Sequence, residues 1–508
     1  MSARNQLTIR LHNSDNVVVA HSDIPAGTEI PEDKITCRDA ISFGHKVAVT
    51  RIKKGEAVKK YGQIIGFAAK AIQAGEHVHT HNVSMGDFDR DYAFCADATP
   101  GTELVAEPAV FNGIVRSDGR VATRNYIGVI SSVNCSASVC RYIADAFRGD
   151  GLKDFPNVDG VVPIIHGTGC GMAGQGECFE YLFNTIAGYA RHPNFAGVLL
   201  IGLGCEVMQT GSFLESGGFK DGPFFHAMTI QDTGGIRATV DRGVGLIRDM
   251  LPDVNRVERQ PISAGHLILG LQCGGSDGYS GITANPALGA ATDLLVRHGG
   301  TAVLGETPEV YGAEHLLTRR AVSRQVGEKL IERIRWWEDY TARNGGKMDN
   351  NPSPGNKAGG LTTILEKSLG AVAKGGSTNL VDVLEYARPI TGKGFVFMDT
   401  PGYDPVSLTG MVAGGANIIC FTTGRGSVYG CRPVPSIKLA TNTEMYNRMA
   451  EDMDINCGVA LDADTSIEEL GEQIFRVILE TASGKKTKSE TFGMGDNEFI
   501  PWQLGAVM

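Results

Sequence analysis

A buried strand that runs into a glycine-rich polar loop is the feature that most limits how this chain can fold. Residues 267–286 read LILGLQCGGSDGYSGITANP. The apolar start suits a strand inside a sheet, and the glycines that follow exclude a regular helix or strand. In α/β proteins, loops at the ends of buried strands bind ligands. We therefore expect this loop, with Ser276 and Asn285, to form part of a binding site.

The same order of strand, loop and helix recurs through residues 109–508, which predicts an α/β fold with Rossmann-like, mostly parallel sheets. Residues 350–360, NNPSPGNKAGG, are expected to be irregular because of their prolines and glycines. Expected strands are 126–131, 158–165, 198–201, 267–271, 301–304, 394–398 and 417–422, and expected helices are 137–147, 178–191, 288–298, 313–344 with a break near Thr318, and 467–483.

Changes in the pattern divide the chain into four segments. Residues 1–85 contain short alternating runs separated by turn residues, which is typical of a small β domain. Residues 86–108 have no sustained period and read as a linker. Two α/β domains follow, residues 109–258 and residues 259–508. A histidine-rich strand followed by a linker suggests that the small domain docks over a site made elsewhere.

Composition excludes several classes of protein. The net charge is −10 and no basic stripe is present, so we expect no nucleic-acid partner. No apolar run has the length of a signal peptide or membrane helix, so we expect a cytoplasmic protein without membrane contact. The eleven cysteines are scattered and odd in number, so free thiols are expected rather than disulfides.

Three histidines alternate at the end of the small domain. His77, His79 and His81 would project from one face of a strand. Three imidazoles on one face can bind a divalent metal or carry protons, and the alternative is a solvated strand edge.

Cysteines lie in several loops that follow expected strands, namely Cys135, Cys170, Cys205 and Cys273. Thiolates favour iron and zinc, and buried cysteines also serve as small apolar residues. No CxxC spacing supports a cluster. We expect these residues to support a reduced site.

Two carboxylates and three loop residues complete the candidate site. Glu306 and Glu309 lie three residues apart after a strand and share a face if a helical turn begins there, where they would suit Mg²⁺, Mn²⁺ or Fe²⁺. The alternative is an acidic helix N-terminus. Asn356, Lys357 and Arg425 lie in loops that could bind a carboxylate or a hydroxyl, or could be plain surface turns.

One loop formally matches a dinucleotide fingerprint. Gly169, Gly171 and Gly174 form GxGxxG after a strand, but no acidic residue ends the next strand about 20 positions on, and Cys170 lies inside the loop. We therefore expect no nucleotide cofactor. A nicotinamide-dependent sugar-acid dehydrogenase and a non-catalytic sugar-acid binding protein remain distant alternatives.

Seven segments, taken together and in order, resemble the altronate/galactarate dehydratase family. They are GHKVA (44–48), GEHVHTHN (75–82), RNYIGV (124–129), GLGCE (202–206), QCGGSDGYSGITANP (272–286), NPSPGNKAGG (351–360) and TTGRGSVYG (422–430). The resemblance implies an N-terminal β-clip (SAF) domain, a linker, a middle domain used in dimerisation and a Rossmann-like C-terminal domain with a metal site. It also implies dehydration of a sugar acid with Fe²⁺ or a similar divalent ion, Mn²⁺ or Mg²⁺, and a homodimer.

The resemblance is mixed with respect to substrate. The HVHTHN segment is similar to altronate-type members, whereas residues 291–300 and 481–487 are similar to galactarate-type members. We expect D-altronate to lose its C2 proton and C3 hydroxyl, giving 2-keto-3-deoxy-D-gluconate, with galactarate as the alternative substrate. A protonated histidine would help the hydroxide leave.

The expected roles are as follows. Candidate acids and bases are His45, His77, His79, His81, His166 and Lys357. Candidate substrate-binding residues are Ser276, Asn285, Asn356, Arg425 and Arg124. Candidate metal ligands are Glu306, Glu309, Asp277 and Cys273.

Overall fold

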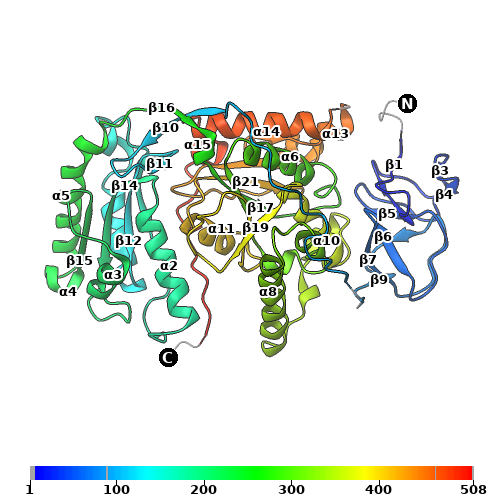
Figure 1. Ribbon diagram of the computed structural model, residues 1–508, viewed down its shortest axis with the longest axis horizontal. Helices are drawn as coiled ribbons and strands as arrows, with labels where there is room; N and C mark the ends of the chain where they lie inside the picture. The colour runs from blue at the N-terminus through cyan, green and yellow to red at the C-terminus, as the bar shows by residue number, and fades with distance from the viewer. Residues whose placement is uncertain (1–5, 87, 89, 464, 506–508) are drawn as a thin grey trace.

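The computed structural model describes residues 6–86, 88, 90–463 and 465–505. Three domains lie in a row, with the C-terminal domain between the other two (Figure 1). No helix within these described ranges combines the length and the apolar content that crossing a membrane requires. The fold is mixed α/β with a small antiparallel N-terminal domain, as expected from the sequence.

The N-terminal domain consists of short antiparallel strands. One sheet has the order β1-β2-β5-β8 and a second has the order β6-β7-β9. The strands are short because turns interrupt them every few residues. Their bounds are β1 Thr8–Ile9, β2 Val17–Ala20, β3 Glu29–Ile30, β4 Ile35–Thr36, β5 Lys46–Ala48, β6 Ala57–Lys60, β7 Gln63–Ala68, β8 His77–Val78 and β9 Val83–Ser84.

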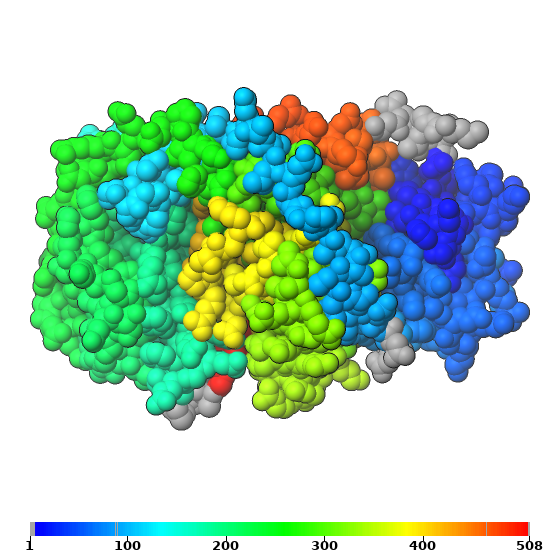
Figure 2. Space-filling model, viewed as in Figure 1, coloured from blue at the N-terminus to red at the C-terminus, as the bar shows by residue number. Residues whose placement is uncertain are grey.

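The linker crosses the face of the C-terminal domain (Figures 1 and 2). The guanidinium of Arg90 donates to Glu314 at 2.9 Å, and the backbone N–H groups of Cys95 and Asp97 donate to the carbonyls of Thr318 and Arg319. Further along, the N–H of Val105 donates to a carbonyl of the same domain. These contacts attach the linker along its length, so it fixes the N-terminal domain in place.

The middle domain holds a four-stranded parallel sheet with the order β13-β12-β14-β15. Beside it, β10 pairs with both β11 and the distant β16, which closes the domain. The bounds are β10 Val110–Val115, β11 Val121–Ala122, β12 Tyr126–Ser131, β13 Gly160–Ile164, β14 Phe195–Gly202, β15 Phe225–Thr229, β16 Gln260–Ser263, α1 Ala137–Asp145, α2 Glu177–Arg191, α3 Thr210–Gly217, α4 Ile230–Thr233 and α5 Ile236–Val254.

A seven-stranded parallel sheet forms the C-terminal domain, with the order β19-β20-β18-β17-β21-β22-β23. Its strands are almost entirely buried because helices cover both faces, which explains their continuous apolar runs. The strands are β17 Ile268–Cys273, β18 Thr301–Leu304, β19 Leu380–Leu384, β20 Gly394–Met398, β21 Ile418–Thr423, β22 Ser436–Ala440 and β23 Ile455–Asn456. The helices are α6 Ala284–Arg297, α7 His315–Thr318, α8 Arg324–Arg343, α9 Pro354–Ala358, α10 Ile364–Val372, α11 Asp404–Ala413, α12 Thr443–Arg448, α13 Val459–Asp462, α14 Ile467–Ala482 and α15 Lys488–Thr491.

One expectation about local structure was wrong. The segment 350–360 is not wholly irregular, because it contains α9. Ser353 caps this helix in a capping box with Asn356, and Pro354 occupies the first turn, where its missing N–H costs nothing. The expected break in the helix after residue 313 is confirmed, since α7 and α8 are separate.

The three domains share apolar cores. One core joins residues of the N-terminal domain, such as Val58 and Ile65, to Ile364 of α10. Another joins the middle domain to the C-terminal domain, where α2 packs on α11. A Cβ at Gly188 of α2 would lie 2.2 Å from the carbonyl oxygen of Ala413, so these helices approach at backbone distance. The domains are therefore fixed relative to one another by packing.

The loop after β17 touches the N-terminal domain with equal closeness. A Cβ at Gly278 would lie 2.2 Å from the carbonyl oxygen of Gly44. We predict that Gly278→Ala destabilises the docked domain by about 1–3 kcal/mol, because backbone cannot yield as a side chain can. Faster proteolysis of the linker and a lower melting temperature would report this. Gly211→Ala, where a Cβ meets nothing within 4 Å, is the matched control. Equal stability of the two variants would contradict the prediction.

Candidate active site

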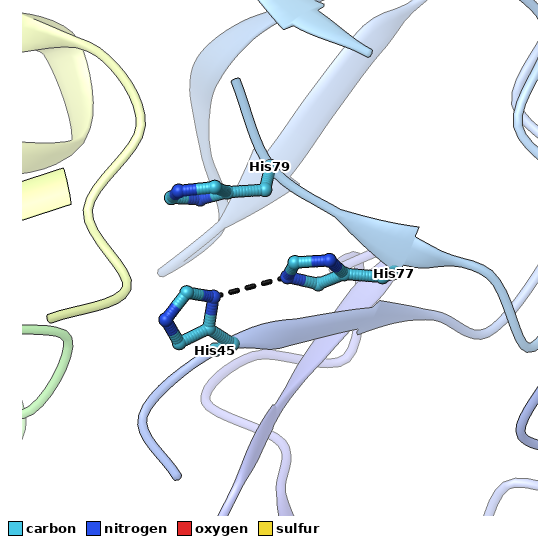
Figure 3. Close-up of side chains that lie close together, drawn as sticks. All are labelled: His45, His77 and His79. Carbon is cyan, nitrogen blue, oxygen red and sulfur yellow. Dashed lines mark hydrogen bonds between the residues drawn. The ribbon is translucent and has the colours of Figure 1, made fainter. Parts of the chain in front are cut away.

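Three histidines of the N-terminal domain face one another (Figure 3). His45 directly precedes β5, His77 lies in β8, and the two strands pair with Val47 opposite His77. His79 follows in a turn. The Nδ1 of His45 lies 3.0 Å from the Nε2 of His77, and each of the three rings offers a nitrogen within 4.8 Å of the others. We call His45, His77 and His79 the histidine group.

The histidine group is neutral near pH 7. Burial, followed by the charges of His45 and His81, lowers the pKa of His77 to about 4. Burial and then Lys46 lower the pKa of His79 to about 3, and burial also lowers the pKa of His45. Neutral imidazoles serve as bases or metal ligands. This favours either role over the cationic acid expected from the sequence.

His81 lies at the exposed edge of this group, and His166 lies apart from it. The ring centroid of His81 is 5.4 Å from that of His77, but His81 does not join the three residues whose ring nitrogens lie within 4.8 Å of one another. His166 is in the middle domain, where its Nε2 lies 3.0 Å from the carbonyl oxygen of Ser131. Burial lowers its pKa to about 4.

A second group is buried in the C-terminal domain at the carboxyl ends of β17 and β18. Cys273 ends β17, and Glu306 and Glu309 follow β18, with Glu309 in a short 3₁₀ turn. Their ligand atoms lie within 4.8 Å of one another, as the sequence predicted for Cys273 and the two carboxylates. Lys374 donates to the Sγ of Cys273 at 2.7 Å, and Lys367 donates to Glu309 at 2.5 Å. We call Cys273, Glu306, Glu309, Lys367 and Lys374 the carboxylate–lysine group.

The two carboxylates of this group differ in their pKa values. Burial and then the charges of Glu309 and Asp404 raise the pKa of Glu306 well above its usual range. Burial alone would raise the pKa of Glu309 too, but Lys367 lowers it below its usual value. The Oε1 of Glu306 finds no hydrogen-bond partner within the described part of the chain, and Glu306 has a left-handed backbone with φ of 62°. An unpartnered carboxylate oxygen beside a thiol and a second carboxylate fits a bound cation.

Sequence reasoning missed Lys367 and Lys374. They lie on α10 and just after it, in a stretch that apart from Glu366 is otherwise apolar or small, ILEKSLGAVAKGG. Lysines seven residues apart lie close to one helix face, so both reach the same group. The available signal was a charged residue recurring in a helix whose every position is buried.

The segment 351–360 extends from one group to the other. The Nδ2 of Asn351 donates to Glu309 at 2.7 Å, and Asn356 donates to the carbonyl of Ser276 at 2.9 Å. At its far end, the carbonyl of Ala358 lies 3.2 Å from the Nε2 of His45. The segment therefore contacts one member of each group, and the two groups come from different domains. Lys357 in this segment is half-buried.

Asp277 and Asn285 make hydrogen bonds that hold the loops in place. Asp277 accepts from Ser280, Thr441 and Asn442, and it does not join the carboxylate–lysine group. A Cβ at Gly424 would lie 2.1 Å from the carboxylate carbon of Asp277, which explains the glycine. Asn285 links the carbonyl of Gly370 to the hydroxyl of Thr422. These roles are structural in this conformation.

Of the remaining expected substrate-binding residues, Ser276 and Arg425 lie beside segment 351–360 and Arg124 does not. Ser276 is buried, and its hydroxyl has no partner within the described residues. Arg425 is exposed, and its side chain would touch a Cβ placed at Gly359. Arg124 is buried elsewhere in an ion pair with Glu490 at 2.6 Å.

A buried charge triad fixes the N-terminal domain beside the site. Lys46 and Lys60 donate to the two carboxylate oxygens of Glu366 on α10, at 2.9 and 3.0 Å. Burial would raise the pKa of Glu366, but the two ammonium groups outweigh it and hold the pKa far below its usual range. Since Lys46 adjoins His45, the triad sets the position of the histidine group.

Comparison with known proteins agrees with this architecture along the chain. The model for the altronate/galactarate dehydratase SAF domain matches residues 6–86. The model for the D-galactarate dehydratase/altronate hydrolase second domain matches residues 113–255, and the model for the D-galactarate/altronate dehydratase C-terminal domain matches residues 264–507.

Individual relatives match over nearly their full length. Galactarate dehydratase (L-threo-forming) of Escherichia coli K12 is 39% identical over 503 residues, covering 96% of this chain and 95% of the relative. Altronate dehydratase of Bacillus subtilis 168 is 34% identical and that of Escherichia coli K12 is 36% identical, each covering 95% of this chain and 96% of the relative.

Proposed function

The chain belongs to the altronate/galactarate dehydratase family and is a hydro-lyase, and we propose that it dehydrates D-altronate to 2-keto-3-deoxy-D-gluconate. The observation that carries the proposal is that segment 351–360 contacts both the neutral histidine group, through Ala358, and the buried carboxylate–lysine group, through Asn351. Removing a proton beside a carboxylate requires a base and cations, and the two groups supply both.

Galactarate is the second candidate substrate. The relative named galactarate dehydratase is 39% identical to this chain, against 34% and 36% for the two named altronate dehydratases. The two substrates differ in the configuration of their hydroxyl-bearing carbons and at their sixth carbon, which is a hydroxymethyl group in altronate and a carboxylate in galactarate. Lys357 within segment 351–360 and Arg425 beside it would bind that carboxylate.

In the proposed reaction, a neutral ring nitrogen of the histidine group accepts the C2 proton. Asn356 and Lys357 bind and orient the substrate carboxylate. The C3 hydroxyl takes a proton from the ammonium of Lys374 and leaves as water, and the resulting enol tautomerises to the keto acid. Lys374 suits this step because the charges of Cys273 and Glu306 outweigh its burial and raise its pKa, so it is protonated at neutral pH.

A divalent ion, Fe²⁺ or Mn²⁺ or Mg²⁺, fits the carboxylate–lysine group. Cys273, Glu306 and Glu309 would hold it, and Glu306 has the unpartnered oxygen. When bound, such an ion would polarise the substrate carboxylate and lower the energy of the developing enediolate. The thiol among the ligands favours Fe²⁺ over Mg²⁺.

The substrate assignment is tested by anaerobic assays of D-altronate, galactarate and D-gluconate with Fe²⁺ and reductant. We expect a 2-keto-3-deoxy product from D-altronate and none from D-gluconate. If only galactarate is turned over, galactarate is the substrate and the proposal of D-altronate is wrong. Turnover of none of the three would contradict both.

The role of the histidine group is tested by His79→Ala. We predict that kcat falls about 10²-fold or more while the bound iron is unchanged, because a base and not a ligand has been removed. His81→Ala, from the same segment but exposed, is the matched control and should keep its activity. If His79→Ala loses its iron, the histidine group and not the carboxylate–lysine group binds the metal.

A further inference from the structure

Three cysteines of the middle domain are exposed at one edge of its sheet. Cys135, Cys170 and Cys205 are the exposed cysteines among the residues that the structure describes, while the others are buried or half-buried. Exposure is unusual for a residue type that is among the most often buried. The proposed dehydration does not use any of the three.

The three residues follow three adjacent parallel strands. Strand β12 lies between β13 and β14. Each strand is followed by one of the cysteines, Cys135, Cys170 or Cys205, three to six residues after the last paired residue of β12, β13 or β14. Parallel strands end at the same edge of a sheet, so the three loops emerge side by side. The topology thus gathers residues that the sequence separates by 35 positions each.

Hydrogen bonds lock the three loops together. The backbone N–H of Asn134 donates to the carbonyl of Thr168 at 2.9 Å, which joins the first two loops. The hydroxyl of Ser132 donates to Glu206 at 2.8 Å, which joins the first loop to the third. A Cβ at Gly169 would lie 2.6 Å from the carbonyl oxygen of Ser132, so the second loop also lies at backbone distance from the first. The three thiols are therefore held on a fixed frame.

The arrangement suits a cluster better than a single ion. Among the described residues, the three thiols are not within 4.8 Å of one another, as ligands of one tetrahedral ion would be. A cluster of several irons and sulfides spans a wider separation and is held by cysteine thiolates. The glycines in these loops, Gly169, Gly171 and Gly204 with positive φ, give the backbone the sharp bends that such a cradle needs.

No fourth ligand is available from the two polar groups beside the cysteines. The Nε2 of His166 contacts the carbonyl of Ser131, and its Nδ1 accepts from the N–H of Thr168. Glu206 accepts from Ser132 through one oxygen and from the N–H of Gly204 through the other. A metal cluster at this edge would therefore keep one coordination position open.

We propose that Cys135, Cys170 and Cys205 bind an iron–sulfur cluster of the [4Fe–4S] type with one iron open to a small oxygen ligand. This centre belongs to the middle domain and is separate from the carboxylate–lysine group. Its binding does not depend on the identity of the sugar acid.

The test begins with the full chain purified without oxygen and without added metal. We expect acid-labile sulfide with at least an equal amount of iron, since the carboxylate–lysine group can hold a further ion, and a broad visible absorption band. Cys135→Ser, Cys170→Ser and Cys205→Ser should each lose the sulfide and the band. Because all three residues are exposed, the variants should keep the wild-type circular dichroism spectrum. Cys95→Ser, half-buried in the linker, is the matched control and should keep the cluster.

Three results would overturn the proposal. The first is iron or zinc without labile sulfide, which indicates a single ion. The second is a sulfide-containing cluster that survives all three substitutions and is lost in Cys273→Ser. The third is anaerobic protein without metal in which all three thiols react freely with a thiol reagent.

Discussion

Glu366→Ala is expected to destabilise the protein by about 3–5 kcal/mol, because it leaves two buried ammonium groups without a counter-charge. Lys46 and Lys60 are fully buried and both donate to this carboxylate. The substitution should also release the N-terminal domain, which brings both lysines to α10. Denaturant unfolding would measure the first effect, and proteolysis of the linker would measure the second.

A triple variant separates the loss of the Glu366 charge from the loss of packing around its side chain. Lys46→Met, Lys60→Met and Glu366→Met together replace the triad by apolar side chains of similar length, which is often neutral or stabilising for buried ion pairs. We expect this variant to recover most of the stability lost in Glu366→Ala. If the triple variant is as unstable as the single one, the loss comes from packing and the charge argument fails.

The triad also predicts a pH dependence with a definite sign. The pKa of Glu366 in the folded protein lies far below its usual value of about 4.3. Its contribution is therefore fully present above that usual value and is lost as the pH falls below it. Unfolding free energies measured between pH 3 and 7 should decline toward acid more steeply for the wild type than for the methionine triple variant.

Glu306→Gln is expected to lower kcat by about 10²–10⁴-fold and to reduce the iron bound. Glutamine keeps the shape of the side chain but removes the charge that the proposed ion requires. The measurements are turnover of the accepted sugar acid and iron content after anaerobic loading. Since the pKa of Glu306 is raised well above its usual range, removing its charge should cost little stability and the melting temperature should hold.

Glu332→Gln is the matched control for this second prediction. Glu332 is exposed on α8 of the same domain, and its substitution should change neither turnover nor iron content. If Glu306→Gln keeps its activity and its iron content, Glu306 has no role in catalysis or in metal binding. Lost activity with iron retained would keep Glu306 as a proton carrier and place the ion elsewhere.

The sequence was most informative about strands and loops. Strands β12, β18 and β20 lie where their apolar runs predicted, because a strand covered on both faces must be apolar at every position. The glycine-rich loop after β17 was recognisable for the same local reason. The structure of segment 350–360 was harder to predict. Its capping box favours a helix, whereas its prolines disfavour one.

The candidate site was only partly predictable. The meeting of Cys273, Glu306 and Glu309 followed from their places after adjacent parallel strands. His45 joined His77 and His79 only through strand pairing between β5 and β8, and His81 stayed at the exposed edge. Lys367 and Lys374 were invisible because a lysine in an apolar helix does not indicate which charge it faces.

By itself, the sequence determined the order of strands, helices and polar loops, and through its seven segments the family. Periodicity and turn residues encode such features because they depend on neighbours within a few positions. Only the tertiary structure decided which distant charges pair, such as Lys46 with Glu366, 320 positions apart, and Lys374 with Cys273, 101 positions apart. The physical reason is that a buried charge is stable only beside its partner, and that partner is chosen by the packing of domains.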